Sequence, residues 1–132
     1  MDVTFAGDGS ATIVPTSEEA AALGEEFGEL LTWFATTLTA LSYLRTGDTD
    51  EFDRKTWAHM LATAERHLGG RLDGIRDALI RAHATVGGTY GEVAKAMAVA
   101  RSTAQYRRDR VTASAPSEWE RWAVSGARSG GA

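Results

Sequence analysis

Apolar residues recur along most of the chain at the three- and four-residue spacing of helices, and they alternate with polar ones only near its start. Val3 and Phe5 alternate with polar neighbours, residues 7–10 have the composition of a turn, and residues 12–14 are rich in β-branched side chains. Residues 1–16 therefore predict either a two-stranded hairpin or a flexible arm, because an isolated hairpin is only marginally stable in water.

A long helix is predicted to follow, with Ser17 as its N-cap. Glu18 and Glu19 would lie in the first turn, where the helix dipole favours acidic side chains. An apolar stripe with a nearly seven-residue repeat runs along this helix and is interrupted at Thr37. Its members are Ala20, Leu23, Phe27, Leu30, Phe34, Leu38 and Leu41, and Leu31 and Leu44 widen it.

This stripe needs a surface to cover it. The cover is either the rest of the same domain or the same helix of a second chain, because small proteins with one long apolar stripe often dimerise through it. A homodimer is therefore one expectation and contact with a protein partner is another. The candidate contact residues are Leu23, Phe27, Leu30, Phe34 and Leu41.

Two further helices are predicted, over residues 50–68 and 71–86. The pair Gly69–Gly70 should end or kink the first, and Gly87–Gly88 should end the second. One face of the first carries Trp57, Met60, Leu61, Ala64 and Leu68. The second is expected to bury Leu72, Ile75, Leu79, Ile80, Val86 and either Ala82 or His83. The predicted fold class is all-α, a helical bundle.

Residues 89–111 predict two short helices joined by a tight turn at residues 98–100. Thr89 would cap the first helix, which ends near Met97, and the second would span residues 101–111. The inward-facing positions are Val93, Ala94, Met97, Val99 and Ala104. The alanines among them let two helices cross closely, as a helix-turn-helix requires. The outward side of the second helix then presents Arg101, Ser102, Gln105, Tyr106 and Arg108, which are residue types that reach phosphates and base edges.

This stretch resembles the helix-turn-helix of bacterial transcription regulators, in the style common in actinobacterial proteins. The shared pattern is Tyr-x-Glu-Val-Ala-x-Ala in the first helix and Val-x-Arg-Ser-Thr at the start of the second. The resemblance implies that residues 90–97 position the motif and that residues 101–111 enter the major groove. It implies DNA-facing roles for Arg101, Ser102, Thr103, Gln105 and Tyr106, and phosphate contacts by Thr89, Tyr90 and Arg108.

Three positions depart from that pattern. Ala98 stands where the turn usually has glycine, which brings strain if the backbone φ is positive there. Ala100 replaces the usual Ser or Thr cap of the second helix, a contribution of about 1 kcal/mol. Arg107 stands at a usually apolar position, where we expect its stem to lie along the core edge with its charge in solvent.

Beyond the motif, Pro116 and its neighbours break the helical pattern, and a short amphipathic turn follows. Trp119 and Trp122 are three residues apart and share its face, where they either cap the core or anchor a partner. The tail from Ser125 is expected to be disordered. The predicted organisation is an arm or hairpin at 1–16, a helical dimerisation or partner region at 17–70, a helix-turn-helix region at 71–111, and a Trp-containing turn with its tail at 112–132.

Net charge divides the chain into two parts. Four basic and twelve acidic residues give residues 1–70 a formal charge of −8, whereas ten basic and six acidic residues give residues 71–132 a charge of +4. This split suggests two roles, and the basic half suits nucleic acid. The chain has no cysteine, no apolar run long enough for a membrane, and no basic cluster at its start. We expect a cytoplasmic protein without disulfides.

Catalysis is not expected. His59, His67 and His83 lack the spacing of a helical metal site, so no metal and no cofactor are predicted. The cluster Glu25, Glu26 and Glu29 is most simply a solvated face or a charged docking surface. Neither glycine pair has the Lys or Ser/Thr register of a phosphate-binding loop.

Two function classes follow from these features. The first is a small dimeric transcriptional regulator that binds double-stranded DNA in a sequence-specific way through its helix-turn-helix. The second is a protein-interaction module, such as an adaptor, an antitoxin-like protein or an inhibitor, whose helix-turn-helix docks on another protein. A third hypothesis is a small-molecule pocket among Phe27, Trp33, Phe34 and Trp57.

Overall fold

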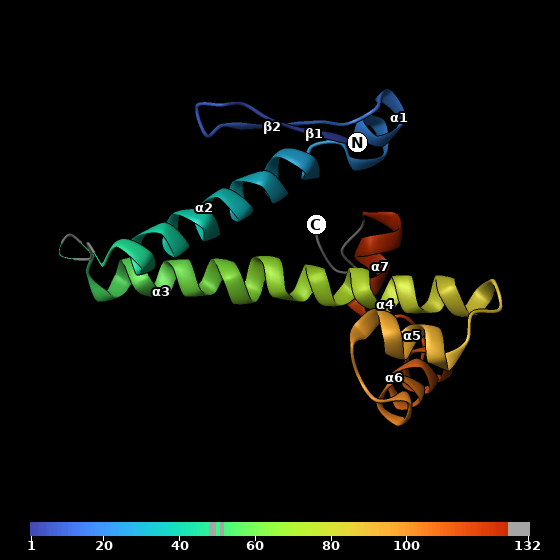
Figure 1. Cartoon of the computed structure of the whole chain (residues 1–132). Helices are drawn as coiled ribbons and strands as arrows, with labels where there is room; N and C mark the ends of the chain where they lie inside the picture. Colours follow the sequence, from blue (N-terminus) through green and yellow to red (C-terminus); the bar gives the residue numbers. More distant parts are fainter. Residues whose placement is uncertain (48–49, 51, 127–132) are drawn as a thin grey trace. The chain divides into compact units, whose positions relative to one another are not determined.

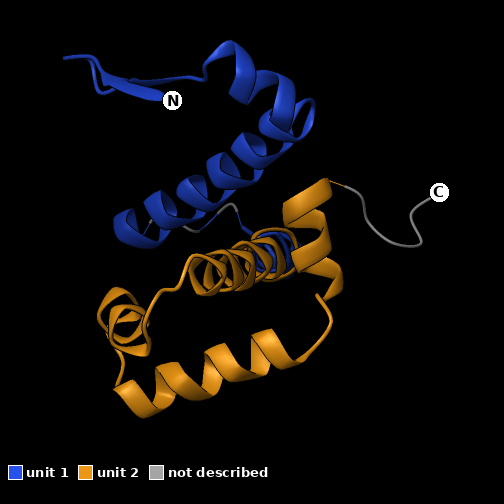
Figure 2. Ribbon diagram, turned by 90° about the vertical axis from the view of Figure 1, so that its right-hand side faces the viewer, with its two compact units in different colours: residues 1–63 blue, residues 64–132 orange. Residues whose placement is uncertain are grey.

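The structure is a computed structural model that describes residues 1–47, 50 and 52–126 of the chain. It is mainly helical with a short N-terminal hairpin, which confirms the all-α prediction (Figure 1). The chain divides into two compact units, residues 1–63 and residues 64–132 (Figure 2). Asp48, Thr49, Glu51 and the tail from residue 127 lie outside the described residues, so the predicted disorder of that tail and part of the predicted start of the second helix are not described.

The first sixteen residues form the hairpin rather than a flexible arm. Strand β1 (Asp2–Phe5) pairs antiparallel with β2 (Ala11–Val14), and Val3 lies opposite Ile13. Asp8 organises the turn, because its carboxylate accepts hydrogen bonds from the backbone nitrogen of Ser10 at 2.9 Å and from its hydroxyl at 2.7 Å. Most side chains of the hairpin are exposed, so this small sheet buries little apolar surface.

The predicted long helix is two helices, α1 (Ser17–Leu23) and α2 (Glu26–Thr46), so the single-helix prediction is wrong. Its N-cap is Thr16 and not Ser17. The Thr16 side chain accepts from the Glu19 backbone, while Glu19 bonds back to the Thr16 backbone in a capping box. Gly24 has a φ of +56°, a conformation that glycine adopts without steric cost, and the helix ends there although the apolar spacing continues.

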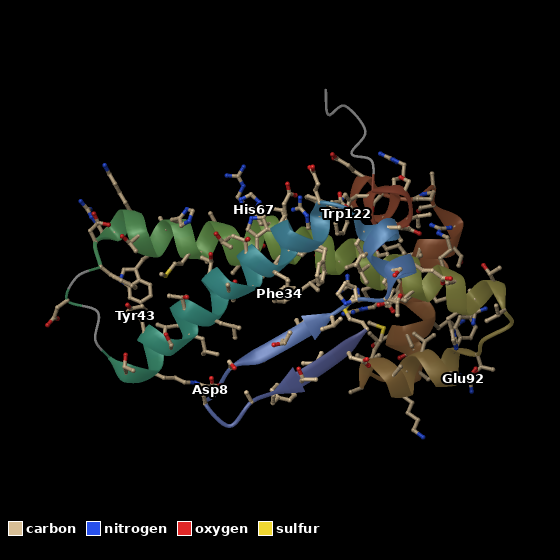
Figure 3. The ribbon with its side chains drawn as sticks, turned by 90° about the horizontal axis from the view of Figure 1, so that it is seen from above. Asp8, Phe34, Tyr43, His67, Glu92 and Trp122 are labelled. Carbon is tan, nitrogen blue, oxygen red and sulfur yellow. The ribbon has the colours of Figure 1, made fainter. Side chains whose placement is uncertain are left out.

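Helix α3 (Arg54–Ala62) begins later than the sequence pattern suggested, because Asp53 provides its N-cap. The Asp53 carboxylate accepts from the Thr56 backbone at 2.8 Å. Three aromatic rings join α2 to the start of α3: Phe52 lies 4.5 Å from the Tyr43 ring and 5.2 Å from the Trp57 ring (Tyr43 is labelled in Figure 3). Among the described residues of the N-terminal unit, Thr63 is the only one that is fully buried.

Gly69 and Gly70 do not end the helix that precedes them. Residues 54–85 are helical throughout, but the hydrogen bonding changes to the wider π pattern in η1 (Thr63–Gly69) before α4 (Gly70–Thr85) begins. Of the apolar face predicted for residues 50–68, Leu68 is buried and Trp57 and Met60 are half-buried, whereas Leu61 and Ala64 are exposed.

The C-terminal unit contains the buried apolar side chains of the described chain. Helix α7 (Glu118–Ser125) packs against α4, and the two tryptophans meet edge to face with ring centroids 6.1 Å apart (Trp122 is labelled in Figure 3). The Arg71 guanidinium lies 4.8 Å from the Trp119 ring centroid and 5.2 Å from that of Trp122. These tryptophans therefore cap the core, which is one of the two alternatives that the sequence left open for them.

The glycines of α4 make this packing possible. A Cβ atom on Gly70 would overlap the Trp119 indole, and one on Gly74 would overlap the Trp119 backbone. Ile80 is buried as predicted and Ile75 is half-buried, but Leu72, Leu79 and Val86 are 50%, 64% and 83% exposed. The prediction that these three are buried is wrong, because the face of α4 that α7 covers is the one with the glycines.

Replacing Gly74 by alanine should lower the free energy of unfolding by about 2 kcal/mol, because the new methyl group has to displace the α7 backbone. The matched control is Gly28→Ala on α2, where nothing lies within 4 Å of the new Cβ. That substitution should raise helix stability slightly. Urea unfolding followed by circular dichroism measures both, and equal effects of the two would contradict the close α4–α7 packing.

Candidate nucleic-acid interface

Helix α5 (Tyr90–Met97) begins and ends where the sequence predicted. Thr89 is its N-cap and forms a capping box: the Glu92 nitrogen donates to the Thr89 hydroxyl at 3.1 Å, and the Thr89 nitrogen donates to the Glu92 carboxylate at 2.8 Å. The backbone hydrogen bond from Thr89, followed by the bond from its side chain, lowers the pKa of Glu92. This cap therefore contributes fully above the usual glutamate pKa and is lost as the pH falls below it.

Helix α6 (Arg101–Ala113) packs on α5 through small side chains. Ala104 is completely buried and shares one apolar cluster with Val93 and Ala94, while Met97 and Val99 pack against that cluster. These are the inward positions predicted from the sequence. The two helices and the turn between them (residues 98–100) form the predicted helix-turn-helix arrangement (Figure 1).

The turn contains both unfavourable backbone features that the sequence pattern indicated. Ala98 has φ 53° and ψ 45°, and it is the only non-glycine with positive φ among the described residues. A left-handed alanine costs roughly 1–2 kcal/mol. Ala100 is the N-cap of α6 and provides no side-chain hydrogen bond, so the first backbone N–H groups of this helix lack a side-chain acceptor.

The five predicted DNA-facing side chains lie together at the start of α6 and all are exposed. Tyr106 is 66% exposed, which is unusual for a large aromatic residue in a small domain. Residues 101–108 contain no acidic side chain. The full set is Arg101, Ser102, Thr103, Gln105 and Tyr106.

The three predicted phosphate contacts have structural partners within the motif. Thr89 caps α5, and the Tyr90 hydroxyl donates to the Asp109 carboxylate of α6 at 2.6 Å, which raises the pKa of Tyr90. Arg108 donates to the Gly88 carbonyl at 2.5 Å, and its guanidinium lies 4.6 Å from the Tyr90 ring centroid. Tyr90 and Arg108 therefore fasten α5 to α6, and their outer atoms are less available to a ligand than the exposed side chains at the start of α6.

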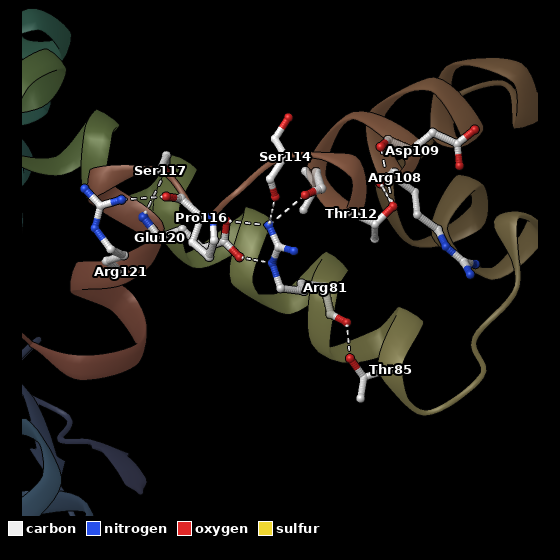
Figure 4. Close-up of polar contacts among 11 residues, drawn as sticks. Arg81, Thr85, Arg108, Asp109, Thr112, Ser114, Pro116, Ser117, Glu120 and Arg121 are labelled. Carbon is white, nitrogen blue, oxygen red and sulfur yellow. Dashed lines mark hydrogen bonds and ion pairs between the residues drawn. The ribbon is translucent and has the colours of Figure 1, made fainter.

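A second set of polar contacts, around Arg81 of α4, was not found by sequence reasoning (Figure 4). The Arg81 guanidinium bonds the Glu120 carboxylate at 2.5 Å, the Val111 carbonyl at 2.6 Å and the Ser114 carbonyl at 3.1 Å. The hydrogen bond to Glu120 raises the pKa of Arg81, and Glu120 itself is buried. One arginine thus joins α4, the end of α6 and α7.

An open cavity of about 490 Å³ lies beside this arginine. Its lining mixes the basic residues Arg76, Arg107 and Arg110 with the acidic Asp73 and Asp77. Arg107, which stands at a usually apolar position of the motif, is exposed. Within the described residues, no group of three or more His, Asp or Glu side chains is arranged to hold a metal ion.

The predicted partner residues all lie in the N-terminal unit. Leu23 is half-buried in α1, Phe27 and Leu30 are half-buried in α2, and Phe34 and Leu41 are exposed. The same unit holds Trp33 and Trp57 of the hypothesised small-molecule pocket, and that hypothesis stays a prediction.

Comparison with known proteins gave no match to a family model, to a curated protein or to a solved structure. In the described part of the chain, no helix has both the length and the apolar character needed to span a lipid bilayer.

Replacing Ala98 by glycine should raise the free energy of unfolding by about 1 kcal/mol, because glycine adopts a positive φ without a Cβ penalty. Ala96→Gly is the matched control, since Ala96 is an exposed residue inside α5 with ordinary helical geometry. It should lose about 1 kcal/mol. Thermal and urea unfolding report both, and a loss of stability in Ala98→Gly would show that the turn is not strained.

Arg108→Ala should destabilise the C-terminal unit by about 1–2 kcal/mol, because it removes the hydrogen bond to Gly88 and the contact with the Tyr90 ring. The neighbouring Arg107→Ala removes the same charge from an exposed position and should change stability by no more than about 0.5 kcal/mol. Urea unfolding of both variants separates the two roles. Similar values would mean that Arg108 does not fasten the motif.

Proposed function

We propose that the protein binds double-stranded DNA in a sequence-specific way through α6 and acts as a transcriptional regulator. The observation that carries the proposal is the exposed start of α6, where Arg101, Ser102, Gln105 and Tyr106 project from a helix held rigidly by the buried Ala94–Ala104 cluster. Rigid presentation of polar side chains at the N-terminal part of a recognition helix is how a helix-turn-helix reads base edges.

Charge supports this proposal. Over residues 89–111, five basic and two acidic residues give a net charge of +3. Asp109 accepts a hydrogen bond from Tyr90, and Glu92 is engaged in the capping box, so both acids are held within the motif. Both carboxylates keep their charge in these contacts, so the motif carries its net charge of +3, which favours contact with phosphates.

The exposed groups of α6 suggest which of them would contact base edges and which would contact the sugar and phosphate groups of DNA. Arg101 and Gln105 have the donors and acceptors that pair with guanine and adenine edges in the major groove. Tyr106 offers an apolar ring beside them for contact with thymine methyl groups or the sugar. The N–H groups at the start of α6, which have no side-chain cap, are suited to a phosphate oxygen.

One observation favours a different function, docking on another protein. Leu72 and Leu79 on α4 and Val86 directly after its end are spaced by seven residues and are exposed. Such a row is typical of a protein contact surface. In that case affinity would depend little on salt, whereas DNA affinity should fall by decades between about 50 and 200 mM salt if several phosphates are contacted.

Arg101→Ala and Gln105→Ala should each weaken binding to a selected DNA site by about 1–3 kcal/mol and relax preference at one base position. The site is first obtained by enrichment from random duplexes with the purified full chain. Affinity for it and for scrambled DNA is then measured across salt concentrations.

Arg54→Ala is the matched control, because Arg54 is exposed in α3 of the other unit and its loss changes the net charge equally. It should leave site preference unchanged. If no sequence is enriched, or if both α6 variants bind like the unmodified chain, α6 is not a recognition helix for DNA.

A further inference from the structure

The open cavity beside Arg81 lies between α4 and α6, and the start of α7 contributes to its lining. All of its lining residues belong to the C-terminal unit. On α6 they form one stripe at spacings of three and four residues, namely Arg107, Arg110, Val111 and Ser114. The volume of about 490 Å³ is typical of sites for small molecules, which measure roughly 300–1,000 Å³. The cavity therefore has room for a ligand larger than an inorganic ion.

The charged groups that α4 and α7 contribute to the cavity are paired with one another. The Arg76 guanidinium lies 3.3 Å from the Asp73 carboxylate and 3.7 Å from the Asp77 carboxylate. Arg81 bonds the buried Glu120 carboxylate, and these two charges cancel. Because two carboxylates share Arg76, two basic and three acidic side chains give this side of the cavity a formal charge of −1.

The α6 side of the cavity carries two positive charges without an acidic partner. Within the described part of the chain, the side chains of Arg107 and Arg110 have neither an ion pair nor a hydrogen bond. They are three residues apart on one helix, so both guanidinium groups can reach the same point in the cavity. Although Asp73 and Asp77 line the same cavity, they pair with Arg76 rather than with the arginines of α6. The two sides of the cavity thus have opposite charges that no ion pair connects, as a bridging ligand requires.

We propose that this cavity binds a small phosphorylated molecule, with the phosphate on Arg107 and Arg110 and with hydroxyl or amino groups of its organic part beside Asp73 and Asp77. The charge of +2 on the α6 side matches a phosphate monoester, which carries about −1.5 to −2 at pH 7. Each guanidinium presents a planar fork of N–H donors that fits phosphate oxygens. The cavity is larger than a phosphate group alone, and the carboxylates on its other side accept hydrogen bonds from donors of the organic part.

DNA also carries phosphates, but the placement of these arginines favours a small molecule. Arg107 lies about 160° around α6 from Gln105, so it is turned away from the side chain assigned to base edges. The acidic side of the cavity would repel the many charges of a duplex, whereas a small ligand brings only one phosphate. The site does not depend on the proposed DNA binding, because its lining includes none of the residues assigned to base edges and its first test contains no DNA.

Binding is measured by NMR titration of the isotope-labelled full chain at constant ionic strength. Ethyl phosphate should cause saturable shifts of the Arg107 and Arg110 side-chain N–H signals and of the Ser114 amide, which sodium chloride should not cause. 2-Aminoethyl phosphate should bind roughly threefold more tightly than ethyl phosphate, because its ammonium group reaches the acidic side of the cavity. Absence of saturable shifts with both phosphates would overturn the proposal. Equal affinity of the two would contradict the placement of the organic part beside Asp73 and Asp77.

Arg107→Ala and Arg110→Ala should each weaken binding of 2-aminoethyl phosphate roughly tenfold, because each removes charged hydrogen bonds to the phosphate. Lys95→Ala is the matched control, since Lys95 is an exposed cation of α5 outside the cavity lining. It should change affinity by less than about twofold. Arg107→Lys keeps the charge but loses the planar fork, so it should recover little of the loss.

These variants also separate a built site from a general positive surface. Equal losses in Arg107→Ala and Lys95→Ala, or full affinity in Arg107→Lys, would show that only net charge attracts the phosphate and would overturn the proposal. If neither small phosphate binds while Arg107→Ala and Arg110→Ala weaken DNA binding, these arginines contact the DNA backbone instead. That result would overturn the small-molecule site and leave the proposed DNA binding intact.

Discussion

The contact between α5 and α6 depends on two small side chains, Ala94 and Ala104. Ala104 has no exposed surface, and together with Val93 it forms the buried cluster of the motif. A larger side chain at either position would force the helices apart, because a well-packed core has no space for additional methyl groups. The position of every exposed residue of α6 relative to α5 follows from this contact. The candidate interface is therefore defined by residues that cannot themselves touch a ligand.

A second set of contacts joins α4, the end of α6 and α7, and it differs chemically from the apolar contact between α5 and α6. Gly70 and Gly74 let the Trp119 segment approach α4, and Arg81 bonds Glu120 of α7 together with two carbonyls at the end of α6. Glu120 is buried, so the loss of Arg81 would leave its carboxylate without the cation that it pairs with. The end of α6 is held by hydrogen bonds and charge, whereas its start is held by apolar packing alone.

Local signals in the sequence predicted the motif well. The Thr89–Glu92 capping pair, the helix bounds at 90–97, the inward alanines and the positive φ at Ala98 all depend on residues within one or two turns of each other. The exposed face of α6 followed from the same periodicity. Its assignment to DNA, in contrast, came from resemblance, and the structure describes the surface without describing what binds it.

Features that depend on distant residues could not be predicted in this way. The Arg81–Glu120 pair joins positions 39 residues apart, and only the fold brings them together. Leu72, Leu79 and Val86 had the spacing of a buried face, but the glycines of α4 determined which face α7 covers. Along α1 and α2 the apolar repeat continued through Gly24, and backbone conformation rather than side-chain pattern ended the helix there. The periodicity of apolar residues identifies a helix face that is suited to burial. It does not identify the element that packs against that face.

The two units differ in how much apolar surface they bury, because every fully buried apolar side chain among the described residues lies in the C-terminal unit. The C-terminal unit contains its own core, yet its turn keeps a strained Ala98 and an uncapped α6 at Ala100, where glycine and serine would each be more stable. Such local costs are tolerated where surrounding packing is sufficient, and they concentrate near functional surfaces. Among its described residues, the N-terminal unit buries no apolar side chain completely, so it has less packing with which to offset costs of this kind.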